Sequence, residues 1–155
     1  MMAARITAPD LTRVEGGVTA AQGFRAAGLH CGIKASRPDL ALVVSDTLAS
    51  AAGVFTTNAV KAAPVLVSME AIQSGAAQAV VINSGNANAC TGAQGLRDAR
   101  EMVALTAKAL GIAGEFVLVA STGVIGRNLP MDALRRGIPR LPALLSRDAA
   151  PAAEA

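Results

Sequence analysis

Aromatic residues are nearly absent from this sequence: it has no tryptophan or tyrosine, and aromatic side chains make up 2% of its 155 residues. Proteins that bind single-stranded nucleic acid stack the bases on aromatic side chains and attract the phosphates with basic patches. Because the formal net charge is only +3, we expect no nucleic-acid partner. Hydrophobic residues reach 52%, so the core must be built from alanine, valine, leucine and isoleucine.

Histidine and cysteine are also scarce. His30 is the only histidine, so neither a His-dependent catalytic triad nor a multi-histidine metal site can be built from this chain alone. Cys31 and Cys90 are the only cysteines, and their separation matches no zinc-binding or CxxC redox spacing. We therefore expect no metal site, and we expect both cysteines to be small buried side chains.

Charged side chains and long apolar runs are limited as well. Charged residues make up 16% of the chain, against about 25% in a typical soluble domain, so we expect some apolar surface to be covered by a partner or by another part of the protein. Apolar runs have the length of Leu40–Val44, whereas a membrane-spanning helix needs about 18 residues. Residues 1–13 have no apolar signal-peptide core. These absences predict a cytoplasmic protein with no membrane partner.

The first part of the chain predicts strands. Residues 18–33 alternate loosely between apolar and polar and are rich in glycine, which indicates bent strands in a hairpin. Leu40–Val44 and Gly53–Thr57 are rich in β-branched residues and predict two further short strands. No helix-length crossover separates these segments, so we expect them to pair antiparallel.

From residue 64 onward the pattern changes to alternating helices and strands. Thr91 and Gln94 have capping-box spacing, which predicts the start of a helix that ends near Gly111. The other expected elements are strands at 79–82 and 116–121 and helices that begin near Pro64 and Pro130. This order fits a layered α/β domain. The polar segment Asn83–Gly92 is either a long turn or a loop whose asparagine amides face a ligand.

One predicted strand ends in a pattern with chemical meaning. The apolar run that starts at Phe116 stops at Ser121-Thr122-Gly123, with a second glycine at Gly126. Where such a strand ends in a glycine turn, backbone N–H groups lack ladder partners, and beside a threonine hydroxyl they form an anion site. The anion would be a phosphate, a carboxylate or the oxyanion of acyl transfer. An ordinary strand-to-helix turn is the alternative, and a Walker-type phosphate loop is disfavoured because its glycine and lysine spacing is missing.

Five motifs in one order make the pattern specific. They are Gly53–Asn58 (GVFTTN), Lys61–Val65 (KAAPV), Asn83–Gly92 (NSGNANACTG), Ser121–Gly126 (STGVIG) and Leu129–Asp132 (LPMD). Together they resemble the bifunctional ornithine acetyltransferase / glutamate N-acetyltransferase family of arginine biosynthesis. The resemblance runs from about Gly17 to the last residue and corresponds to most of the family's amino-terminal α subunit.

The resemblance implies a fold and a mechanism. It implies an Ntn-hydrolase-like α/β/β/α arrangement of which this chain is a part. In the family a precursor cleaves itself at an Ala-Thr bond, and the freed threonine of the β subunit carries the acetyl group from N-acetylornithine to glutamate. The family's oxyanion hole falls by resemblance on Thr122 and Gly123. Acetyl-CoA is an alternative acetyl donor in bifunctional members, and no cofactor is implied.

The chain also departs from the family pattern, because no Ala-Thr dipeptide occurs in its 155 residues. We therefore expect an α subunit that is inactive alone and works in an αβ hetero-oligomer with a β subunit that carries the nucleophile. The expected organisation is an arm at 1–17, an α-subunit-like α/β domain at 18–142, and a helical or linker tail at 143–155, truncated before the cleavage site. The alternative function is a non-catalytic small-molecule-binding or interaction module on the same scaffold.

Overall fold

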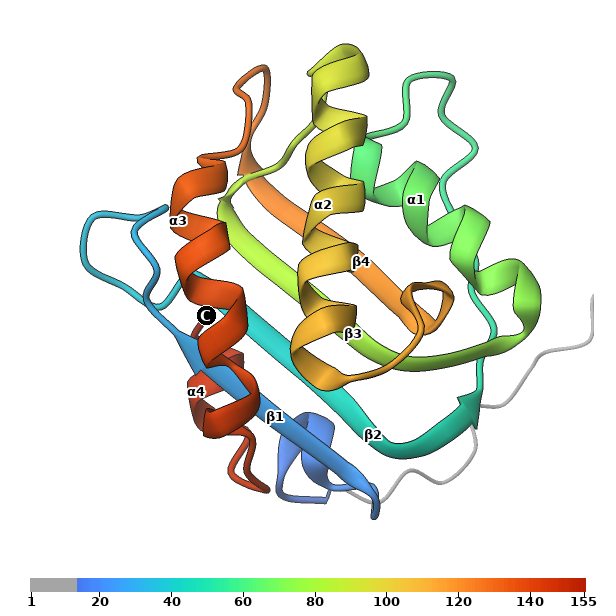
Figure 1. Ribbon diagram of the computed structural model, residues 1–155, viewed down its shortest axis with the longest axis vertical. Coiled ribbons are helices and arrows are strands. Elements are labelled where there is room, and N and C mark those ends of the chain that lie inside the picture. The colour runs from blue at the N-terminus through green and yellow to red at the C-terminus, as the bar shows by residue number, and fades with distance from the viewer. Residues whose placement is uncertain (1–13) are drawn as a thin grey trace, which may run out of the picture.

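A computed structural model describes residues 14–155 and shows one sheet with helices packed against it (Figure 1). The sheet has four strands in the order β1-β2-β3-β4. The strands are β1 (Phe24–Leu29), β2 (Leu40–Ser50), β3 (Ala76–Asn86) and β4 (Val117–Val124). β1 pairs with β2 and β2 with β3 in antiparallel fashion, whereas β3 and β4 are parallel. The helix α2 (Gly92–Leu110) connects β3 to β4 and explains the parallel pair, because a parallel connection needs a dozen or more residues.

Three helices cover one face of this sheet (Figure 1). They are α1 (Ala63–Ala71), α2 (Gly92–Leu110) and α3 (Met131–Gly137). Alternate strand residues such as Leu42, Val81 and Val119 point into this layer and are almost fully buried. From the helices, Met102 and Leu134 are fully buried in the same core cluster. The core therefore lies between the sheet and one helix layer, and it is built from aliphatic side chains as the composition requires.

The helix boundaries follow the local chemistry predicted from the sequence. Pro64 lies in the first turn of α1, and Gly111 in the left-handed conformation ends α2. α2 begins after Thr91, as predicted, but the capping box is wrong: Thr91 makes no side-chain cap, and its hydroxyl donates to Asn88 instead. The predicted helix after Pro130 is confirmed as α3.

Two predicted strands are wrong. Residues 18–33 contain a single strand, β1, whose partner is β2 rather than a neighbour within the segment. Gly53–Thr57 forms no strand, because β2 itself continues to Ser50 and the chain then leaves the sheet. Val54 is fully exposed, so its β-branched side chain has no sheet face to pack on.

The carboxyl-terminal residues return to the start of the fold. α4 (Ala150–Glu154) packs on β1, on the face opposite the other helices, where a Cβ at Gly28 would meet the carbonyl of Pro151. The Ser84 hydroxyl at the end of β3 donates to the carbonyl of Ala155. Residues 1–13 of the expected arm lie outside the described residues, and the division at 1–17, 18–142 and 143–155 stays a prediction.

The helices of residues 14–155 include none that is both long and apolar enough to cross a membrane. The layered α/β architecture predicted from the sequence is confirmed: in the described part of the chain one sheet carries α1, α2 and α3 on one face and the short α4 on the other.

Candidate functional site

The predicted Ser-Thr-Gly site lies on a strand, not in a turn after it. β4 continues through Thr122 and Gly123 to Val124, so the prediction that the strand ends at residue 121 is wrong. Its extension is possible because Gly85 and Gly123 pair across β3 and β4. Gly123 has a φ of 130°, and a Cβ there would lie 2.3 Å from the carbonyl carbon of Gly85. The sequence therefore needs glycine at this point for close strand approach and for its backbone conformation.

β4 is an edge strand, so the backbone groups on its outer side have no neighbouring strand in the described chain. The hydroxyl of Ser68 on α1 donates to the carbonyl of Val119 at 2.7 Å and accepts from its N–H at 3.0 Å, which identifies the direction of the outer edge. Backbone groups alternate in direction along a regular strand, so we infer from Val119 that the N–H of Gly123 is directed to this same outer edge, next to the point where the pairing of β3 with β4 shifts register. On the inner side, Val124 accepts from the N–H of Ala87, which agrees with the alternation. Thr122 and Gly123 are both exposed.

A cavity lies along the outer edge of β4, next to these residues. It has a volume of about 310 Å³ and lies between the irregular segment at 52–55, the start of α1 and β4. Its lining is mostly apolar, with Phe55 and Val65 among the contributing side chains. Ser121 also lines it, and the Ser121 hydroxyl oxygen is buried without a hydrogen-bond partner. Sequence reasoning missed this cavity, because the composition of the segment at 52–55 predicts a strand.

The asparagine-rich segment has a structural role in the described chain. The side-chain amide of Asn86 donates to the carbonyls of Arg127 and Asn128 at 3.2 and 2.9 Å. The side-chain amide of Asn88 donates to the carbonyl of Gly95 at 2.8 Å. These bonds hold the loop after β4 and the first turns of α2 in place. The interpretation of Asn83–Gly92 as one long turn is wrong for residues 83–86, which belong to β3, whereas the side-chain amides of Asn86 and Asn88 donate to carbonyls of this chain.

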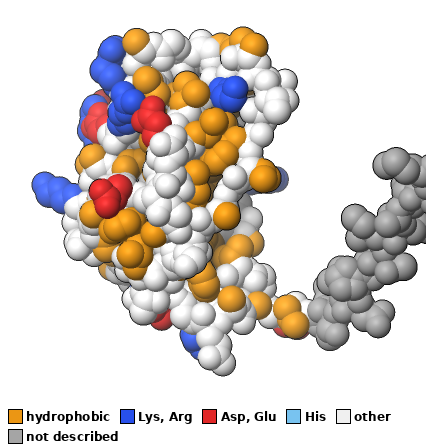
Figure 2. Space-filling model, turned by 90° about the vertical axis from the view of Figure 1, so that its right-hand side faces the viewer, with side chains coloured by type: hydrophobic (Ala, Val, Ile, Leu, Met, Phe, Trp, Pro, Cys, Tyr) orange, Lys and Arg blue, Asp and Glu red, His pale blue; other side chains and the backbone are white. Residues whose placement is uncertain are grey.

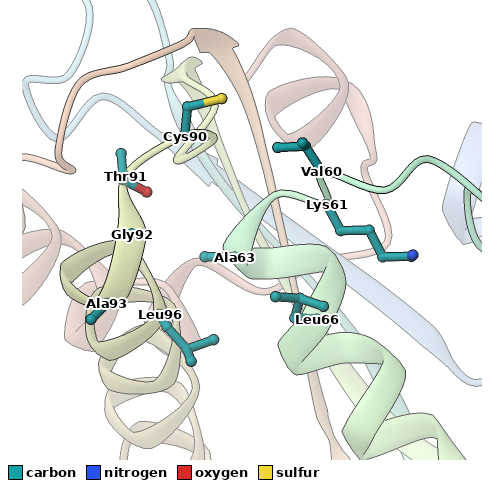
Figure 3. Close-up of a pocket in the computed structure, with 9 residues that line it drawn as sticks. All are labelled: Val60, Lys61, Ala63, Leu66, Cys90, Thr91, Gly92, Ala93 and Leu96. Carbon is teal, nitrogen blue, oxygen red and sulfur yellow. The ribbon is translucent and has the colours of Figure 1, made fainter.

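A second cavity of about 350 Å³ separates the beginnings of α1 and α2. Figure 3 shows Leu66 and Leu96 extending from the two helices at its base, while the amino group of Lys61 points away from them. The Lys61 ammonium donates to the carbonyl of Asn58 at 2.9 Å. Cys90 lies at the rim and is exposed, so the prediction that it is buried is wrong.

Cys31 is partly buried, as expected for a small apolar side chain. Burial, together with a hydrogen bond to the Asp39 carboxylate and its charge, raises the pKa of the Cys31 thiol to about 12. It is therefore a neutral thiol at physiological pH and a poor nucleophile. No group of three histidine, cysteine, aspartate or glutamate residues within 14–155 could hold a metal ion.

Hydrophobic side chains are exposed along the side of the molecule that carries α1 and the β4 edge. Figure 2 shows them running down the middle of this view, with charged side chains gathered toward one margin. Val54 is 100% exposed, Val60 75% and Ile125 63%. These residues flank the two cavities, in the segment before α1 and in the loop after β4. Exposed apolar side chains therefore lie in the loop directly after Thr122 and Gly123 and in the segment before α1.

Residues 25–155 match the sequence profile of the ArgJ family. The chain is 46% identical over 157 aligned residues to the arginine biosynthesis bifunctional protein ArgJ of Shouchella clausii, covering all of this chain and 38% of that protein. It is 56% identical over 144 residues to the protein of the same description from Symbiobacterium thermophilum, covering 90% of this chain and 36% of that protein. The chain thus spans a little over a third of these curated relatives.

Two crystal structures are similar to this chain over nine tenths of its length. The arginine biosynthesis bifunctional protein of Bacillus halodurans matches with a TM-score of 0.86 and 45% identity, over 91% of this chain and 75% of that one. The ornithine acetyltransferase of Mycobacterium tuberculosis, solved in complex with ornithine, matches with a TM-score of 0.87 and 44% identity, over 90% and 77%. These likenesses confirm the predicted fold class.

Proposed function

The chain belongs to the ArgJ family, and we propose that it is the α portion of an acetyltransferase that moves an acetyl group from N-acetylornithine to glutamate. The relatives are described as bifunctional proteins of arginine biosynthesis, and one solved relative is an ornithine acetyltransferase with bound ornithine. As an enzyme of amino-acid biosynthesis it would work in the cytoplasm.

The proposed contribution of this chain is the oxyanion hole, formed by the Thr122 hydroxyl and the Gly123 N–H. The observation that carries it is the open edge of β4, where the alternation of backbone groups from Val119 directs the Gly123 N–H outward, next to an exposed threonine. Preorganised donors of this kind stabilise the negative charge that develops on the acyl oxygen, and they are usually the largest electrostatic contribution to acyl transfer.

The reaction would proceed by a ping-pong route through an acetyl-threonine. The hydroxyl of a β-subunit threonine attacks the acetyl carbonyl of N-acetylornithine, its proton passes through the threonine's own α-amino group to the departing amine, and ornithine leaves. The amine of glutamate then attacks the acetyl ester, the threonine recovers its proton, and N-acetylglutamate leaves. Each half-reaction passes through a tetrahedral oxyanion, so Thr122 and Gly123 would act twice. Acetyl-CoA would enter as an alternative donor, with its thiol as the leaving group.

Two observations support a partner that supplies the nucleophile. This chain covers about three quarters of each solved chain but little over a third of each curated relative. The solved chains are therefore much shorter than the curated relatives. Such a difference in length is expected if the solved chains are subunits cut from a precursor. The exposed apolar residues beside β4 give a β subunit a surface to cover in an αβ hetero-oligomer.

Thr122→Ala in the complete protein tests the proposal. We expect kcat for acetyl transfer to fall about 10²- to 10³-fold, the usual cost of one oxyanion donor, while the unfolding midpoint stays unchanged because the Thr122 side chain is exposed. Thr47→Ala is the matched control, since Thr47 is also an exposed threonine on a strand. Full turnover by the Thr122 variant would remove this residue from the mechanism.

Intact-mass measurement tests the covalent step separately. After incubation of the complete protein with N-acetylornithine, we expect an acetyl adduct on the β subunit and none on this chain. A complete protein with neither adduct nor turnover would favour the non-catalytic binding module.

A further inference from the structure

A polar cavity between the beginning of α2 and the beginning of α3 has no role in the proposed reaction. It has a volume of about 420 Å³. The polar side chains that line it are Gln94, Asp98, Asn128, Asp132 and Arg135. Unlike the cavities at the β4 edge and at the start of α1, it is lined by formal charges of both signs. It is large enough to take a small ligand or a long side chain.

The unusual member of this set is Asp98, which is only 2% exposed. One of its carboxylate oxygens, Oδ1, accepts a hydrogen bond from the side-chain amide of Gln94 at 2.6 Å. Oδ2 has no hydrogen bond and no ion pair anywhere in the described chain. A buried carboxylate is costly unless it is paired with a charge or fully hydrogen-bonded. Because Asp98 lines the cavity, Oδ2 is the oxygen left to bind a group there.

The cationic side chain that lines the cavity, Arg135, already binds two other carboxylates. Arg135 is the only lysine or arginine that lines the cavity, and its Nε and Nη2 donate to the carboxylate of Glu101 at 2.6 and 3.0 Å. Its Nη1 donates to Asp132 at 2.9 Å. These bonds raise the pKa of Arg135 and lower the pKa of Glu101. The ion pairs of Arg135 are with Glu101 and Asp132 and not with Asp98.

We propose that this cavity binds one basic group, an alkylammonium or a guanidinium, which donates to Oδ2 of Asp98. A charge-assisted bond to a buried carboxylate is about twice as strong as a bond between neutral groups, and a guanidinium fits the planar carboxylate. Within 14–155, no three acidic, histidine or cysteine side chains are arranged to hold a metal ion. The basic group comes either from a free ligand or from a lysine or arginine of the rest of the protein. The inference does not depend on the proposed acetyl transfer.

Crystallography of the complete protein distinguishes the two sources. A lysine or arginine side chain of the protein within hydrogen-bond distance of Oδ2 supports the proposal with an internal source. If the cavity is open, crystals are soaked in methylguanidinium or in methylurea, its neutral isostere. Density for methylguanidinium at Oδ2, with none for methylurea, supports a free ligand. A cavity with neither a basic side chain nor methylguanidinium overturns the proposal, as does equal binding of methylurea.

Calorimetric titration with methylguanidinium gives the solution test of the free-ligand arm. Asp98→Asn keeps an oxygen for the Gln94 amide but removes the charge, so we expect affinity to fall about tenfold or more. Asp132→Asn is the matched control: Asp132 lines the same cavity, but its side chain is 84% exposed, so affinity should change by about twofold at most. Unchanged affinity in the Asp98 variant refutes the proposal, and so does binding at crystal concentration only. If that variant does not fold, the comparison of methylguanidinium with methylurea on the unaltered protein decides.

Discussion

Replacing Asp39 with asparagine should destabilise the protein more than any surface charge change. Asp39 is fully buried just before β2. Its Oδ1 accepts from the backbone N–H of Cys31 at 2.7 Å, and its Oδ2 accepts from three consecutive N–H groups, those of residues 32–34, at 3.2, 2.7 and 2.9 Å. One carboxylate therefore organises the whole connection between β1 and β2.

The expected loss in the free energy of unfolding follows from the number of backbone N–H groups that donate to Asp39. Asparagine offers one acceptor oxygen, so its amide group must face either the Cys31 N–H or the three N–H groups on the other side. At least one partly buried N–H loses its acceptor, which costs about 1–3 kcal/mol, and the remaining bonds lose the assistance of the charge. We expect Asp39→Asn to lower the free energy of unfolding by about 3–5 kcal/mol, a large fraction of the 5–15 kcal/mol typical of a domain.

The same site gives a pH dependence with a definite sign. Burial raises the pKa of Asp39, but the N–H donors outweigh it and hold the pKa below its ordinary value. The folded state therefore binds this proton less readily than the unfolded state. The stabilisation from Asp39 is fully present above about pH 4, the ordinary carboxyl pKa, and is lost as the pH falls through the folded-state value. The amide of the Asp39→Asn variant does not titrate, so the difference in stability between the two proteins should shrink on acidification.

Urea unfolding followed by circular dichroism measures both effects, at pH 7 and at about pH 3. Asp46→Asn in β2 is the matched control. Asp46 is exposed and pairs with Arg25 at 2.7 Å, so its replacement should cost less than about 1 kcal/mol. The reasoning is refuted if Asp39→Asn lies within about 1 kcal/mol of the unaltered protein at pH 7, or if the difference grows as the pH falls.

Two further outcomes are expected. Gly123→Ala should lower the thermal unfolding midpoint and abolish acetyl transfer, because its Cβ would meet the β3 backbone at 2.3–2.7 Å. Gly126→Ala is the control: Gly126 has a positive φ but nothing within 4 Å of its Cβ position, so this change should lower the free energy of unfolding by only about 1–2 kcal/mol. Equal unfolding midpoints for the two variants would contradict the clash. Iodoacetamide at neutral pH should modify the exposed Cys90 before Cys31, whose thiol has a pKa raised to about 12. Mass spectrometry of tryptic peptides gives the order of modification. Faster modification of Cys31 would be inconsistent with its burial.

Local chemistry explains which elements could be predicted from the sequence. Pro64, Gly111 and Pro130 mark helix ends through backbone restrictions that act within one turn, and all three helices begin or end near them. The pattern at 18–33 predicts the wrong partner, because strand pairing depends on residues distant in sequence. Gly53–Thr57 has the composition of a strand but finds no neighbour.

The sequence likewise predicts some of the important polar residues and not others. Thr122 and Gly123 stand out in the sequence because a hydroxyl and a glycine interrupt an apolar run, although their place on an edge strand could not be predicted from that pattern. Asp39 and Asp98 give no such signal. Asp39 follows a proline and has the appearance of a turn residue, and Asp98 is one polar residue on an amphipathic helix. Their importance comes from burial, which depends on how α2, α3 and the β1–β2 connection pack in three dimensions.

The return of the last residues to β1 affects how the protein can fold during synthesis. β1 leaves the ribosome well before Ser146, yet Ala26 exchanges backbone hydrogen bonds with Ser146 on its outer edge. The Thr19 hydroxyl bonds the carbonyl of Arg147, 128 positions later. Closing so long a loop is entropically costly and slow. Until residue 147 has been synthesised, the outer edge of β1 therefore has no hydrogen-bond partner. During this time the edge can pair with other chains.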